Sequence, residues 1–82
     1  MNIQFGDRVI YKLDGNIGKG VAIGFMKYNK DVVLLAGTAY IGMHINVKYC
    51  SSISKCHDFA NKLRKRYEKK YPNQMMNQDS CG

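Results

Sequence analysis

The sequence contains no tryptophan, a single proline and only 6 acidic residues against 13 lysines and arginines. It also lacks any apolar run near the ~20 residues that a transmembrane helix needs. Residues 1–4 have neither the charged nor the apolar region of a signal peptide. With 82 residues the chain is long enough for one domain with a small core. These features predict a single cytosolic domain that does not associate with membranes.

Cysteines are also few, and their number argues against a disulfide framework. There are three, Cys50, Cys56 and Cys81, and an odd number cannot pair completely within one chain. We therefore expect free thiols in a reducing compartment. Cys50 and Cys56, with His44 and His57, could supply metal ligands, but a structural zinc site usually has cysteines two to four residues apart. The sequence predicts no metal and no cofactor.

Positive charge is concentrated in the last third of the chain. Residues 51–72 hold seven lysines and arginines against two acids, whereas residues 1–50 hold six against three. A field of this kind favours polyanions or acidic protein surfaces and speeds encounter with them. The alternative is a solvated helix whose charges only keep the protein in solution.

Alternating apolar and polar residues predict short strands in the first part of the chain. Residues 8–13, 20–28 and 43–49 alternate with the period of a half-buried strand. Residues 31–36 show no alternation and are apolar from residue 32 onward, which is typical of a central strand covered on both faces. Within the second segment Val21, Ile23 and Phe25 are expected on one face, and Gly24 indicates a bend or bulge.

The pattern becomes helical after a short connection. Residues 50–54 are expected to form a tight turn, and residues 55–71 an amphipathic helix that Pro72 ends. Its apolar stripe contains Phe59, Leu63 and Tyr67. We expect this stripe either to close an open end of the β-domain or to cover the second face of the apolar strand. The folded domain would then span residues 1–72, with residues 73–82, polar and unpatterned, as a disordered tail.

The first two strand segments also resemble a known type of domain. Residues 6–11, Gly-Asp-Arg-Val-Ile-Tyr, and residues 18–24, Gly-x-Gly-Val-x-Ile-Gly, are similar to the opening hairpin of small SH3-like barrels of the KOW, Tudor and CarD-type groups. The resemblance covers residues 5–53. It implies a barrel of four or five antiparallel strands that binds nucleic acid or a protein through its loops and open face. No Tudor-type aromatic cage is evident, and the basic helix that follows is not part of the shared pattern.

Together these patterns predict a β-rich α+β domain, an SH3-like antiparallel barrel followed by a basic amphipathic helix. Its leading function is to bind RNA or DNA, mainly through phosphates. The candidate phosphate-binding residues are His44, Lys48, Lys62, Arg64, Lys65, Arg66, Lys69 and Lys70. Tyr28 and Tyr40 are candidate platforms on which unpaired bases stack.

Two other functions remain open from the sequence. In the first, the chain is an accessory or inhibitory module, of the kind that phages or mobile elements encode, and docks its basic helix and an exposed Tyr40–Ile41 loop on an acidic partner protein. In the second, a small ribonuclease would use His44 or His57. The six acids show no pairing suited to acid/base catalysis, so we expect a binding protein and not an enzyme.

Overall fold

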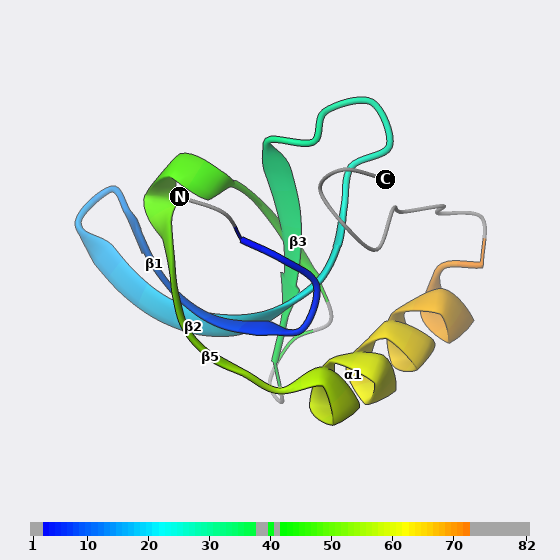
Figure 1. Ribbon diagram of the computed structural model, residues 1–82. Helices are drawn as coiled ribbons and strands as arrows, with labels where there is room; N and C mark the ends of the chain where they lie inside the picture. The colour runs from blue at the N-terminus through cyan, green and yellow to red at the C-terminus, as the bar shows by residue number, and fades with distance from the viewer. Residues whose placement is uncertain (1–2, 38–39, 41, 73–82) are drawn as a thin grey trace.

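A computed structural model describes residues 3–37, 40 and 42–72, which form a curved antiparallel sheet with one helix against it (Figure 1). The elements are β1 (Asp7–Leu13), β2 (Asn16–Phe25), β3 (Val32–Ala36), β4 (Met43–Asn46), the 3₁₀ turn η1 (Val47–Tyr49), β5 (Cys50–Lys55) and α1 (His57–Lys70). The predicted β-rich α+β class with a C-terminal helix is confirmed. The predicted tail, residues 73–82, lies outside the described part of the chain.

The five strands follow the order β4-β3-β2-β1-β5, so β4 and β5 are the two edges of the sheet. Both edges nevertheless contribute to one apolar cluster, through Ile45 of β4 and Cys50 of β5. The sheet must therefore curl around this inner cluster. Among the described residues no ladder joins β4 to β5, so the predicted closed barrel is not confirmed and the sheet is open between its edges.

The bulge predicted at Gly24 is present, and it changes which face Phe25 occupies. The register of β2 against β3 shifts between Ala22 and Gly24. Val21 and Ile23 lie on the outer face, but Phe25 lies in the inner cluster with Ala22. The expectation that Phe25 shares a face with Ile23 was wrong, because the extra residue of a bulge reverses the alternation that follows it.

Helix α1 covers the outer face of β2 and β3, which is one of the two positions expected for it. Val33 and Leu35 of β3 point into the inner cluster, while Leu34 and Ala36 pack in an outer cluster with Leu63 and other residues of α1. The helix residues buried there also include Ala60 and Tyr67, with Phe59 half-buried beside them. Strand β3 is thus apolar on both faces because each face packs against protein.

The segment between β4 and α1 differs from its prediction. The alternation ran to residue 49, but β4 ends at Asn46, whose Oδ1 accepts a hydrogen bond of 3.0 Å from the backbone N–H of Lys48 and starts η1. The expected turn at residues 50–54 is instead β5, paired with β1. At this edge of the sheet only Cys50 is buried, so β5 can form without an alternating apolar pattern. The helix begins at His57 rather than at residue 55.

The Gly-Asp turn before β1 is held by a buried carboxylate. Asp7 is 1% exposed; its Oδ2 accepts a hydrogen bond of 2.8 Å from the Gln4 N–H, and its Oδ1 lies 2.7 Å from Lys55 Nζ. Gly6 has φ of +92°, a conformation that an L side chain rarely adopts. The turn therefore ties the first strand to β5 immediately before the helix.

One thiol and two tyrosine hydroxyls that are buried or half-buried predict that the fold becomes less stable at alkaline pH, where such groups lose their protons. Burial raises the pKa of Cys50 above its ordinary 9.0, and burial with nearby Tyr11 raises the pKa of Tyr40 above 10.0. Burial and then Tyr71 also raise the pKa of Tyr67. The unfolded chain loses these protons first, so unfolding becomes easier as pH rises through 9.0 and then 10.0.

Urea denaturation at intervals from about pH 8 to 11 will test this, with a midpoint that falls across that range. A Tyr40→Phe variant, which has no phenol at that position, should show a shallower fall at the upper end. A midpoint that stays constant or rises with pH would contradict the prediction.

Candidate functional site

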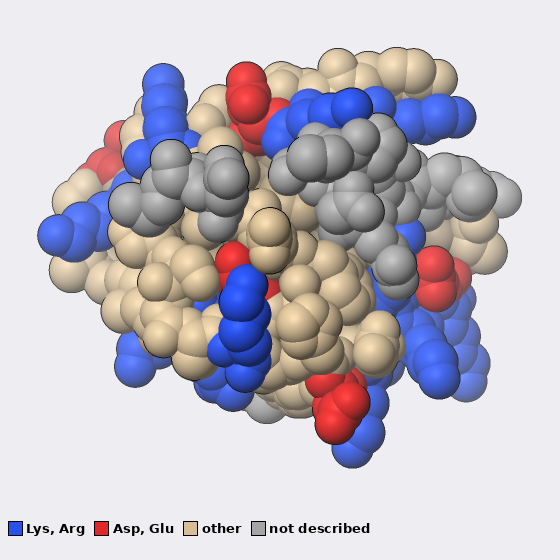
Figure 2. Space-filling model, viewed as in Figure 1, with Lys and Arg blue, Asp and Glu red and all other residues tan. Residues whose placement is uncertain are grey.

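The exposed cations of α1 form what we call the basic ridge: Lys62, Lys65, Arg66 and Lys69. Their spacing of three and four residues places them on one side of the helix. All four are exposed, while Ala60, Leu63 and Tyr67 are buried on the side that packs against the sheet. The ridge extends ~10 Å along the helix axis, because Lys62 and Lys69 are seven positions apart and each position adds about 1.5 Å. In Figure 2 blue side chains gather at the lower right, where Figure 1 places α1.

Local acids do not neutralise the ridge. The salt bridges among the described residues join Lys55 to Asp7 and Arg64 to Glu68, and neither involves a ridge residue. Lys70, at the end of the helix, is exposed with its Nζ 5.6 Å from the ring centroid of Tyr71. The four ridge charges are therefore available to a partner.

Arg64 was predicted at the margin of this surface, but the structure places it inside the protein. It is 9% exposed, and its Nη1 donates a hydrogen bond of 2.7 Å to the backbone carbonyl of Ile23. Its Nε also donates to Oε2 of Glu68 at 3.2 Å. The guanidinium joins the helix to the bulge of β2 and does not belong to the exposed surface.

The two predicted tyrosine platforms lie in different environments. Tyr40 is half-buried, packs against the inner cluster and donates a hydrogen bond of 2.9 Å from its Oη to the carbonyl of Lys19, so its ring is not a free platform. Its predicted loop partner, Ile41, lies outside the described residues. Tyr28 is 89% exposed in the β2–β3 loop, with Lys27 Nζ 5.5 Å from its ring centroid.

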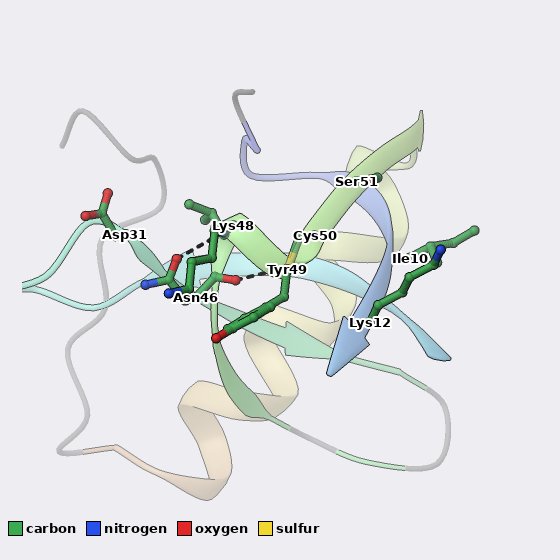
Figure 3. Close-up of a pocket in the computed structure, with 9 residues that line it drawn as sticks. Ile10, Lys12, Asp31, Asn46, Lys48, Tyr49, Cys50 and Ser51 are labelled. Carbon is green, nitrogen blue, oxygen red and sulfur yellow. Dashed lines mark hydrogen bonds between the residues drawn. The ribbon is translucent and has the colours of Figure 1, made fainter. Parts of the chain in front are cut away.

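A second surface feature is an open hollow of about 840 Å³, which we call the Tyr49 hollow. It is lined by residues of β1, by the residue before β3 and by residues 46–51 (Figure 3). Lys48, a predicted site residue, lines it together with Lys12 and Tyr49. His44 is exposed on β4 and is not among the lining residues.

Sequence reasoning missed Tyr49 because it extended β4 by three residues and so assigned this ring to the inner face. The turn η1 instead leaves Tyr49 40% exposed, with Lys48 Nζ 5.1 Å from its ring centroid. Asn46 was the available signal, since asparagine often ends a strand by capping a turn with its side chain.

Comparisons with known proteins give no further guidance: no family model matches this chain, and no curated protein or solved structure matches it. Over the described residues there is no helix long and apolar enough to cross a membrane. Nor does that part of the chain gather three or more His, Cys, Asp or Glu residues that could hold a metal ion. What the geometry defines is a small β-rich domain with a cationic helix face and a hollow beside an exposed aromatic ring.

Proposed function

We propose that this protein is a small cytosolic module of the SH3-like barrel type that binds RNA or DNA, mainly through phosphates. The observation that carries the proposal is the basic ridge, four exposed cations on one face of a helix that is anchored to the sheet. The barrel type is supported by the curl of the sheet, since its two edge strands share one apolar cluster and are joined by a single 3₁₀ turn.

The ridge suits a phosphate backbone better than it suits a base edge. Lysine and arginine on an exposed helix face contact phosphates without reading sequence. Binding would release about one counterion for each phosphate that is neutralised, so four contacts imply a slope near −3.6 in a plot of log affinity against log salt concentration. Affinity should then fall about 100-fold between ~50 and ~200 mM salt.

Charge reversal on the ridge tests the proposal. We expect Lys65→Glu/Lys69→Glu to weaken binding to a short RNA or DNA duplex at least about 100-fold at ~50 mM salt and to flatten the salt dependence. Fluorescence anisotropy with labelled oligonucleotides measures both effects, and circular dichroism checks that the variant is folded.

The matched control is Lys19→Glu/Lys27→Glu, which changes the net charge equally on exposed residues of β2 and the β2–β3 loop. Its affinity should fall by less than about tenfold, because long-range charge is largely screened by salt. Equal losses in the two variants would show that net charge, and not the ridge, drives binding. Failure of the unaltered protein to bind either nucleic acid at low salt would refute the proposed function.

An acidic protein surface is the second candidate partner, and the exposed ring of Tyr28 favours it. A tyrosine that is 89% exposed on a loop is the kind of aromatic residue that protein interfaces use as an anchor. Capture experiments with and without nuclease separate the two candidates. A complex that survives nuclease and ~200 mM salt and is lost in Tyr28→Ala would support the protein partner.

A further inference from the structure

We propose that the Tyr49 hollow seats one unpaired base of a single-stranded nucleic acid, stacked on the ring of Tyr49. This inference rests on the proposed function and makes it more specific, because the basic ridge alone does not distinguish single strands from duplexes.

The ring of Tyr49 is presented by a rigid piece of backbone. At the start of η1 the side chain of Asn46 caps the turn, and at its end the Cys50 N–H donates to the carbonyl of Val47. The Cys50 thiol also donates to the backbone carbonyl of Asn46, with an S–O distance of 3.7 Å. A platform held in this way loses little conformational entropy when a base stacks on it.

Polar groups around the ring match the remaining parts of a nucleotide. Lys12 from β1 and Lys48 from η1 both line the hollow, and Figure 3 shows them on two sides of it. Two lysines against the single acid, Asp31, leave the lining positive, which suits a phosphate. The Oδ1 of Asn46 is occupied by the Lys48 N–H, so its Nδ2 remains to donate to a base carbonyl.

The hollow also differs from the surroundings of the other exposed tyrosines. Tyr28 and Tyr71 each have a lysine Nζ near the ring, at 5.5 and 5.6 Å from the centroid. Tyr71, however, packs against Tyr67 with a centroid distance of 5.1 Å, and neither Tyr28 nor Tyr71 lines the hollow. A lysine–tyrosine pair thus occurs three times in the described part of the chain, and of these three tyrosines Tyr49 is the one that lines the hollow.

A base can reach a ring in a hollow only when it is unstacked, so the site should discriminate against duplexes. Stacking on an aromatic ring typically changes affinity by about 5- to 100-fold when the ring is removed. Oligonucleotides of uracil or thymine suit the test, because they form little secondary structure and their bases present carbonyl oxygens that Asn46 could bind.

The experiment compares Tyr49→Ala with the unaltered protein on ~12-nucleotide oligo(U), oligo(dT) and a duplex of equal length. We expect Tyr49→Ala to weaken single-strand binding about 5- to 100-fold and to leave duplex binding unchanged. Tyr49→Phe should keep most of the single-strand affinity, and Lys12→Ala should reduce it a few-fold. Tyr71→Ala is the matched control, because Tyr71 also has a lysine near its ring but lies outside the hollow, and it should have little effect.

Several outcomes would overturn the inference. These are an unchanged single-strand affinity in Tyr49→Ala, an equal loss on the duplex, or an equal loss in Tyr71→Ala. None of these outcomes changes the loss of affinity expected for Lys65→Glu/Lys69→Glu. Phosphate binding by the basic ridge would therefore remain as a proposal, and the base site would be rejected. If the unaltered protein binds none of the three probes, the proposed function and this inference fail together.

Discussion

Replacing Arg64 with alanine is expected to destabilise the protein by about 3 kcal/mol. The guanidinium donates to the carbonyl of Ile23, which is fully buried. Ile23 lies at the bulge, between the paired positions Ala22 and Gly24, and has no partner position on β3 in the ladder. Leaving such a group without a donor costs about 1–3 kcal/mol, and loss of the packed arginine stem adds to that. Urea denaturation followed by circular dichroism measures the change.

Lys65→Ala is the control for Arg64→Ala, since it truncates the neighbouring cation on the exposed side of the same helix. It should change stability by less than about 0.5 kcal/mol. Glu68→Ala should cost no more than about 1 kcal/mol, because the glutamate side chain is 55% exposed in its salt bridge with Arg64. A stability loss for Arg64→Ala as small as that for Lys65→Ala would show that the buried hydrogen bond does not form in solution.

Arg64 also shows why the candidate surface could be predicted only in part. Helical periodicity correctly separates the basic ridge from the buried stripe, because it depends on the helix alone. The periodicity places Arg64 between the basic ridge and the buried stripe, and it cannot decide whether the Arg64 side chain points to solvent or to the sheet. The direction of the Arg64 side chain is decided by the carbonyl of Ile23, which lies 41 residues earlier in the chain at the bulge of β2.

The strands were predictable where the sequence has an alternating or a continuous apolar pattern, and they were harder to predict elsewhere. Strands β1 and β3 follow directly from their residue patterns. Strand β5 could not be found in this way, since it is an edge strand with a single buried residue, Cys50, and is recognised by its pairing with β1. Long-range pairing of this kind leaves no local pattern in the sequence.

A Leu63→Ala substitution is expected to cost about 2–5 kcal/mol of stability, the range for removing a buried leucine. Leu63 is 1% exposed and packs in the outer cluster with Ile23 and Leu34. A domain of this size has a total stability on the order of 5–10 kcal/mol, so the variant should approach unfolding at moderate temperature. Urea denaturation followed by circular dichroism and by tyrosine fluorescence measures the loss and shows whether helix and sheet unfold together.

Lys62→Ala is the matched control for Leu63→Ala, because it makes the same helix-favouring replacement at the adjacent exposed position. Its stability should change by less than about 0.5 kcal/mol. A loss below about 1 kcal/mol for Leu63→Ala would mean that α1 is not docked on the sheet in solution. The basic ridge would then have no fixed orientation, which would remove the structural support for the proposed function.

The Leu63→Ala variant also tests whether binding depends on a folded helix. Helix α1 has 14 residues, and isolated helices of that length are only marginally stable in water. The basic ridge is therefore ordered mainly by the packing of its opposite side. Apparent affinity scales with the fraction of molecules in the binding-competent state. At a temperature where Leu63→Ala is half unfolded and the unaltered protein is not, its apparent affinity for a duplex should be about half of its own value when folded. A duplex affinity independent of temperature in this variant would show that the cations bind equally well without a folded helix.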